Sequence, residues 1–178
     1  MEFKAKIMDE QQMHRSLARI THEIIEKNGG AEHVCLIGIK RRGEPLARML
    51  AENIEHFEGI RPPVGSVDIT LYRDDLTETA PQPTTGESLI PCTLSDYNVV
   101  LVDDVIFTGR TVRAAIEAIF RCGRPRSIQL AVLIDRGHRE LPIRPDFVGK
   151  NIPTSKSELV SVRVQEFDGE TDVSLYGI

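Results

Sequence analysis

Acidic and hydroxyl side chains follow an apolar run near the middle of the chain. Asp103 and Asp104 come directly after residues 99–102, and the turn 108–111 (Thr-Gly-Arg-Thr) follows shortly. Such a turn at the start of a helix presents backbone N–H groups and hydroxyls to a phosphate. Adjacent carboxylates could hold sugar hydroxyls or the ligand shell of a magnesium ion. The spacing therefore predicts a site for a phosphorylated sugar. Alternatively, the acids only cap the next helix.

A cluster of cations lies between two glycines earlier in the chain. Lys40, Arg41 and Arg42 follow the apolar run 33–39 and precede Gly43 and a segment with helical spacing. Three consecutive positive charges at such a junction favour a polyanion, and glycine lets backbone amides approach it. No Gly-Lys-Ser or Gly-Lys-Thr follows, so this is not a Walker-type loop. A solvated run of charges is the alternative interpretation.

The segments that would position these residues alternate between strand-like and helix-like patterns. Strands are expected at 33–39, 65–73, 99–102, 127–134, 158–167 and 172–176. Helical spacing covers 10–27, 45–57 and 112–120, the first beginning with a capping box of Asp9 and Gln12. Continuous apolar strands are typical of a parallel sheet buried on both faces. We therefore expect an α/β fold with a mostly parallel twisted sheet and ligands at the carboxyl ends of its strands.

Length and composition limit the classes of protein that remain. The chain has 178 residues, 40% of them hydrophobic, enough for one domain with a proper core, and we expect no division within 1–178. No run approaches the roughly 20 apolar residues of a membrane span, and the N-terminus lacks a secretory pattern. Three scattered cysteines do not make a disulfide framework. We expect a cytoplasmic protein that does not associate with membranes.

Charge is unevenly distributed along the chain. The net charge of −5 argues against general affinity for nucleic acid, so RNA contact would need a local basic patch. Residues 136–156 hold five Lys or Arg against two acids, and Arg15, Arg19 and His22 share the polar face of the first helix. An ordinary solvated face is the alternative for that helix. Residues 74–90 hold four acids, two prolines and no Lys or Arg, which predicts a mobile loop.

The stretch 98–111 resembles the phosphoribosyl-pyrophosphate (PRPP) signature of type I phosphoribosyltransferases. The resemblance implies their fold, with a flexible lid loop and a small hood region, expected at about 74–90 and 135–160. It implies Mg²⁺ bound with PRPP, a catalytic role for Asp103 and Asp104, and pyrophosphate contact by Arg73; the metal would meet the acids mainly through PRPP. The implied PRPP- and nucleotide-binding residues are Lys40, Arg41, Arg42, Gly43, Val105, Ile106, Phe107, Thr108, Gly109, Arg110, Thr111 and Val112. The role of Arg41 is left open.

Three further segments are similar to a narrower group, the pyrimidine-operon attenuation proteins that are also uracil phosphoribosyltransferases. These segments are 68–75, 133–144 and 149–157. The resemblance implies the substrates PRPP and uracil, the product UMP, and a homodimer or higher homo-oligomer. It places uracil near Arg136 and the backbone at Val160. Contacts to a pyrimidine-operon leader RNA are expected from Arg19, His22, Arg139, Arg144 and Lys150.

Three hypotheses of function remain open from the sequence. The protein is a salvage enzyme that makes UMP and nothing more, or an RNA-binding attenuator that uses the transferase pocket as a nucleotide sensor. In the third, one protein performs both roles. We favour the third, because the local basic residues support RNA contact while the complete PRPP signature supports catalysis.

Overall fold

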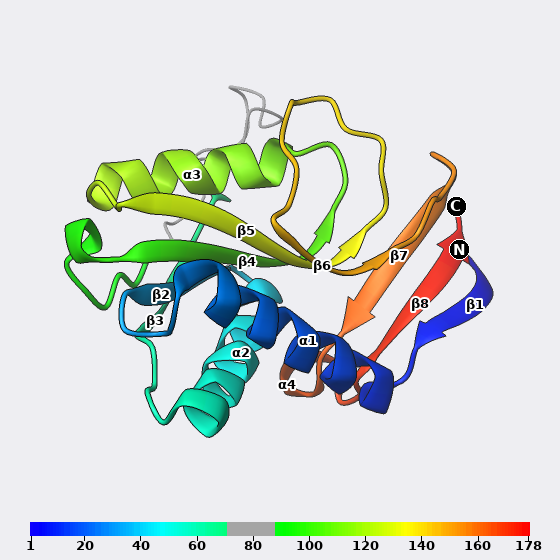
Figure 1. Cartoon of the computed structure of the whole chain (residues 1–178). Helices are drawn as coiled ribbons and strands as arrows, with labels where there is room; N and C mark the ends of the chain where they lie inside the picture. The colour runs from blue at the N-terminus through cyan, green and yellow to red at the C-terminus, as the bar shows by residue number, and fades with distance from the viewer. Residues whose placement is uncertain (71–87) are drawn as a thin grey trace.

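The computed structural model describes residues 1–70 and 88–178. Its larger sheet has five parallel strands in the order β3-β2-β4-β5-β6 (Figure 1). Their bounds are Val34–Ile39 (β2), Val64–Val67 (β3), Asn98–Ile106 (β4), Ser127–Asp135 (β5) and Phe147–Asn151 (β6). The prediction of a parallel α/β sheet is confirmed, although β6 was not foreseen.

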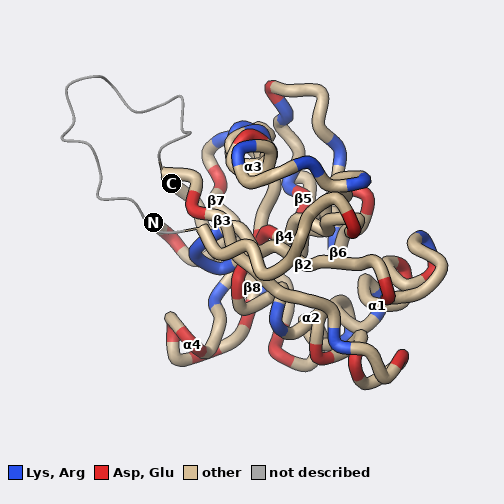
Figure 2. The backbone as a smooth tube through the Cα atoms, turned by 90° about the vertical axis from the view of Figure 1, so that its left-hand side faces the viewer, with Lys and Arg blue, Asp and Glu red and all other residues tan. Residues whose placement is uncertain are grey.

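Helices cover both faces of this sheet. α1 (Glu10–Asn28) and α2 (Gly43–Glu58) lie on one face, and α3 (Arg110–Cys122) lies on the other (Figures 1 and 2). Side chains of β4 alternate between the two faces, as strand geometry requires. Val100 packs in the core beneath α1 and α2, whereas Leu101 packs in the core beneath α3. The site residues at the end of β4 therefore rest on a strand fixed from both sides.

The first helix forms for the reasons that the sequence indicated. The Asp9 side chain accepts a hydrogen bond from the Gln12 N–H at 2.7 Å, and the Gln12 side chain accepts one from Asp9 N–H at 2.9 Å. Gly29 ends the helix with φ +64°, a conformation that favours glycine. The apolar stripe is buried as predicted, with Met13 and Ile24 fully inaccessible.

A second, three-stranded antiparallel sheet joins the two ends of the chain. β8 (Asp172–Gly177) lies between β1 (Glu2–Met8) and β7 (Glu158–Arg163). The Arg163 guanidinium forms an ion pair with Asp172, whose side chain is 2% exposed. The hood was expected at about 135–160, whereas this small sheet draws its strands mainly from the chain ends. β1 was not foreseen from the sequence.

Some boundaries differ from the expected ones. β4 extends through Ile106, so the acidic pair lies inside the strand, because β5 continues to pair with it as far as Asp135. β3 ends at Val67, and Ser66, which was expected to face outward, is buried; its backbone exchanges hydrogen bonds with Leu89. The strand expected over 158–167 ends at Arg163, where the short helix α4 (Gln165–Asp168) soon follows.

Two expectations depend on a part of the chain that is not described. Arg73 and most of the expected loop 74–90 lie outside the described residues. The end of that range is described, and there Leu89 forms an isolated antiparallel bridge with Ser66. Within 1–70 and 88–178, no helix is both long and apolar enough to cross a membrane.

Candidate functional site

Asp103 and Asp104 lie where β4 loses one neighbour and keeps the other. Pairing with β2 stops at Val102, whereas pairing with β5 continues past the acids. The Asp104 N–H donates to Asp103 Oδ1 at 2.9 Å, which fixes the first carboxylate against the backbone. Asp103 is 6% exposed, and Asp104 is partly exposed. The Asp103 carboxylate is thus fixed and buried, whereas the Asp104 carboxylate is partly accessible to a ligand.

Burial sets the electrostatics of this pair. The pKa of Asp103 is raised well above its usual range, first by burial and then by the negative charge of Asp104. Burial also raises the pKa of Asp104, although hydrogen bonds from Asp103 and Val105 and the charge of Arg42 oppose that rise. Such a pair favours cationic or hydroxyl-bearing ligands, which would relieve the uncompensated negative charge.

The turn after β4 has a conformation that requires glycine. Gly109 has φ +93°, and α3 begins at the next residue. The N–H of Arg110 lies 3.3 Å from Thr108 Oγ1, and the Thr108 carbonyl accepts hydrogen bonds from Glu140 and Leu141. The turn is therefore fixed by a second loop at the start of α3, where the sequence predicts that a phosphate binds.

That second loop is held by Arg139. Its guanidinium donates to the Phe107 carbonyl at 2.9 Å, to the Ile143 carbonyl at 2.9 Å and to the Asp135 carboxylate at 2.7 Å. The side chain is 22% exposed. Arg139 was expected to meet RNA, but these inward contacts occupy its guanidinium and hold the loop that fixes the turn 108–111.

Residues 40–43, called the cation loop below, pack directly against β4 just before Asp103 and Asp104. A Cβ on Gly43 would lie 2.3 Å from the Val102 carbonyl oxygen, so only glycine allows this approach. Arg42 forms an ion pair with Asp168 at 2.8 Å, and the Arg41 guanidinium lies 4.6 Å from the centre of the Phe167 ring. The two loops with predicted anion-binding roles therefore flank the acidic pair.

Arg136, expected near uracil, is buried between the two sheets. It is 6% exposed and lies 4.1 Å from the centre of the Phe107 ring. Its Nη2 donates to the carbonyls of Ser155 and Glu158, at 3.1 and 2.7 Å. Burial lowers its pKa from the ordinary value. Val160, whose backbone was expected near uracil, is 6% exposed.

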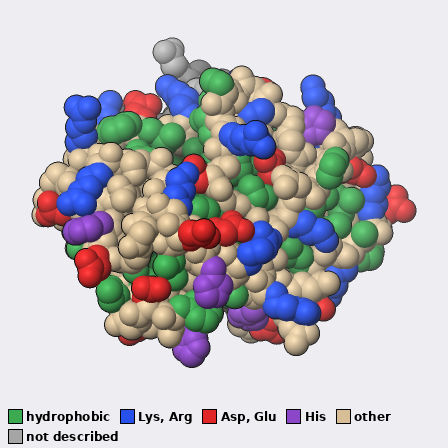
Figure 3. Space-filling model, viewed as in Figure 1, with side chains coloured by type: hydrophobic (Ala, Val, Ile, Leu, Met, Phe, Trp, Pro, Cys, Tyr) green, Lys and Arg blue, Asp and Glu red, His purple; other side chains and the backbone are tan. Residues whose placement is uncertain are grey.

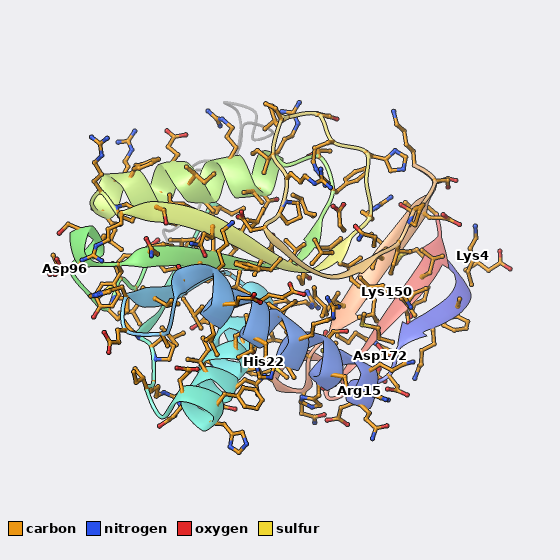
Figure 4. The ribbon with its side chains drawn as sticks, viewed as in Figure 1. Lys4, Arg15, His22, Asp96, Lys150 and Asp172 are labelled. Atoms are coloured by element: carbon orange, nitrogen blue, oxygen red, sulfur yellow. The ribbon has the colours of Figure 1, made fainter. Side chains whose placement is uncertain are left out.

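Most residues with predicted RNA contacts are exposed around α1 and β6. Arg19 donates to the carbonyls of Val148 and Gly149, at 3.2 and 2.5 Å, and thus ties α1 to β6. His22 is exposed and stacks on Phe57 with 4.3 Å between ring centres. Figure 4 shows His22 on α1 and Lys150 above that helix. On this face Lys and Arg side chains are interspersed with acids (Figure 3). Arg144 and Lys150 are exposed.

Sequence reasoning missed the residues that support the loops from outside. Asp168 and Phe167 contact the cation loop, and Thr154 accepts a hydrogen bond from Arg136 Nε at 3.0 Å. All three are distant in sequence from their partners. A local signal was present at Gly169, which ends α4 with φ +71° and lies between the strands expected at 158–167 and 172–176.

The donor set suits a magnesium ion that arrives with its substrate. In the described ranges, no group of three or more His, Cys, Asp or Glu could hold a metal ion unaided. The carboxylate oxygens of Asp103 and Asp104 are the hard ligands that Mg²⁺ prefers, and further oxygens would have to come from a ligand or water. The residues therefore fit a metal bound jointly with a phosphorylated compound.

Comparisons with known proteins agree with this arrangement. Residues 5–166 match the family model described as a phosphoribosyl transferase domain. The chain is 60% identical to a "Bifunctional protein PyrR" of Clostridium novyi, covering 99% of each chain, and 58% identical to one of Caldicellulosiruptor bescii, covering 97% of this chain and 95% of the relative.

Solved structures extend the likeness to the fold. A hypoxanthine-guanine phosphoribosyltransferase of Bacillus anthracis aligns with TM-score 0.72 at 16% identity, covering 100% of each chain. A hypoxanthine phosphoribosyl transferase of Trypanosoma cruzi gives 0.74 at 18% identity, covering 97% of this chain and 91% of the other. With the acidic pair and both loops in place, the chain belongs to the phosphoribosyltransferase family and groups there with the relatives called bifunctional protein PyrR.

Proposed function

We propose that this protein transfers phosphoribose from PRPP to uracil, giving UMP and pyrophosphate, in the cytoplasm. The observation that carries the proposal is the position of the acidic pair between two loops suited to anions. Gly43 allows the cation loop to pack against the Val102 carbonyl, before the acids. Gly109 forms the turn that begins α3, just after the acids. A ligand with phosphates at both ends and a sugar between them matches this order.

The residues would act mainly by positioning and by stabilising charge. Asp103 and Asp104 would accept hydrogen bonds from the ribose hydroxyls and thus hold the sugar. Backbone N–H groups at 108–111 would receive the 5′-phosphate, and the cation loop would receive the pyrophosphate as it leaves. Since departure of pyrophosphate leaves an electron-poor ribose, negative charge at the acids stabilises that state.

Mg²⁺, when bound with PRPP, would offset charge on the leaving pyrophosphate. Asp104 is the residue placed to meet its ligand shell, because Asp104 is the more exposed acid of the pair. Arg73 stays a prediction for pyrophosphate contact. Arg136 is proposed to shape the uracil pocket through Phe107, on which its guanidinium lies.

Uracil transfer tests the enzymatic role directly. Asp104→Asn should abolish UMP formation from uracil and PRPP while the far-ultraviolet circular dichroism spectrum stays that of the parent. The matched control is Asp96→Asn, on an exposed turn at the other end of β4, which should keep full activity. Near-normal turnover by Asp104→Asn with Mg²⁺ present would refute the assignment.

We also propose a regulatory role, in which the protein binds a pyrimidine-operon leader RNA in response to uridine nucleotides. The exposed residues His22, Arg144 and Lys150, with Arg19 beside them, support it. Planar Arg and His side chains suit stacking on unpaired bases together with phosphate contact. A homo-oligomer would extend this basic surface. The second candidate is a salvage enzyme without an RNA partner, which the intact PRPP site alone would explain.

An RNA titration separates these two candidates. Leader RNA should bind the parent protein, and UMP should tighten binding if the nucleotide at the turn 108–111 orders the neighbouring loop. A scrambled RNA of equal length controls for general attraction to phosphate. Equal affinity for both RNAs, unchanged by UMP, would leave the salvage enzyme as the function.

A further inference from the structure

A short helix near the C-terminus holds the cation loop from outside the site. Arg42 Nε and Nη2 donate to the Asp168 carboxylate at 3.3 and 2.8 Å. Beside this pair, the Arg41 guanidinium lies 4.6 Å from the centre of the Phe167 ring. Phe167 and Asp168 of α4 thus contact two consecutive arginines of the cation loop. Arg42 and Asp168 are 126 residues apart in the chain.

Asp168 is itself fixed in place. Its Oδ2 accepts a hydrogen bond from the Val164 N–H at 2.9 Å, and its side chain is 18% exposed. The hydrogen bond from Arg42 is the main reason that the pKa of Asp168 lies below its ordinary value. The Asp168 carboxylate is held by the backbone and accepts hydrogen bonds from two nitrogens of the Arg42 guanidinium, which fixes the orientation of that planar group.

The orientation matters because Arg42 belongs to a loop that lies beside the acidic pair. A Cβ on Gly43, the next residue, would lie 2.3 Å from the Val102 carbonyl oxygen and 3.4 Å from the Asp103 Cα. Two guanidinium nitrogens donate to Asp168, which leaves Nη1 without a partner among the described residues. The cation is therefore held on one side and available on the other.

We propose that Asp168 is a positioning residue, which orients Arg42 so that Nη1 receives the pyrophosphate group of PRPP beside Asp104. This inference rests on the proposed transferase function. Asp168 does not touch the substrate; it acts through Arg42. The C-terminal segment, which carries no chemistry in its own sequence pattern, thus determines how well the loop binds its anion.

The test is the variant Asp168→Asn, assayed for UMP formation. Its amide oxygen can still accept the Val164 N–H, so α4 keeps that bond while the charged grip on Arg42 is lost. We expect the KM for PRPP to rise roughly tenfold, the scale of one hydrogen bond to a charged group. The KM for uracil and kcat should stay within about twofold of the parent values.

The matched control is Glu166→Gln on the same helix. Glu166 forms an ion pair with Arg48 of α2 and does not contact the cation loop among the described contacts. This variant loosens α4 without releasing Arg42, so the KM for PRPP should not change. In an Arg42→Ala background, Asp168→Asn should cause no further rise in KM, because its partner is already absent.

The outcomes separate this inference from the proposed function. Calorimetric titration of the parent with PRPP and Mg²⁺ tests the function, which fails if no binding is seen. If the parent binds, parent-like affinity in Asp168→Asn overturns the positioning role alone. An equal rise in KM for Glu166→Gln, or an additive effect with Arg42→Ala, overturns it too, because either result means a general structural effect.

Discussion

Replacing Asp103 by Asn should stabilise the ligand-free protein while abolishing uracil transfer. Asp103 is 6% exposed, and its pKa is raised by burial and by the adjacent charge of Asp104. The folded state therefore binds a proton more tightly than the unfolded chain, and stability falls as pH rises from near 3.8 towards the raised folded-state pKa. At pH 7 the carboxyl is ionised in the unfolded chain, so the cost of the buried charge reduces stability there. The Asn oxygen can still accept the Asp104 N–H, so the variant removes charge and little else.

The expected gain at pH 7 is about 1–2 kcal/mol, in the range that an uncompensated buried polar group costs. For a chain of this size that corresponds to about 2–8 °C in the unfolding midpoint. Urea denaturation at pH 7 should show the gain, which should vanish below pH 3.8, where the carboxyl is protonated in both states. The exposed Asp96→Asn controls for net charge. PRPP with Mg²⁺ should stabilise the parent and not Asp103→Asn. A variant less stable than the parent at pH 7 would refute the electrostatic reasoning.

Four other substitutions test the loops, the small sheet and the proposed RNA surface. Gly43→Ala should lower the free energy of unfolding by about 2–3 kcal/mol and weaken PRPP binding in calorimetry, because its Cβ would lie 2.3 Å from the Val102 oxygen. Arg163→Ala should lower the free energy of unfolding, measured in urea at pH 7, by about 2–3 kcal/mol, because Asp172 would stay buried without its guanidinium partner. Since Arg163 lowers the pKa of Asp172, this loss of stability should shrink as pH falls through that pKa. Arg144→Ala and Arg19→Ala should each weaken leader-RNA binding by about 1–2 kcal/mol in filter binding. Only Arg19→Ala should also lower the unfolding midpoint, because it ties α1 to β6.

The sequence predicted the parts of the fold whose causes are local. The capping box of Asp9 and Gln12, the apolar stripe of α1 and the continuous strands each depend on neighbours a few residues away. Boundaries set by a distant partner were wrong. β4 continues past its acids where β5 pairs with it, and the backbone of Ser66 pairs with Leu89, far along the chain. Neither partner could be inferred from the pattern of the strand itself.

In the candidate site too, features that depend on neighbouring residues could be predicted, whereas contacts with distant residues could not. The acidic pair and the two glycine-containing loops could be predicted because their chemistry lies in contiguous residues. Charge alone did not indicate that the Arg139 guanidinium turns inward to Phe107 and Asp135. Counting Arg139 as surface charge therefore overstates the basic surface of the protein.

The C-terminal segment connects the candidate site to both ends of the chain. β8 lies between β1 and β7, so the two ends of the chain form one sheet, and α4 lies in the connection between β7 and β8. Because Asp168 in that connection grips Arg42, loss of order in the small sheet would release a cation beside the acidic pair. If Arg42 receives pyrophosphate as proposed, this ion pair couples the stability of the terminal strands to the affinity for pyrophosphate.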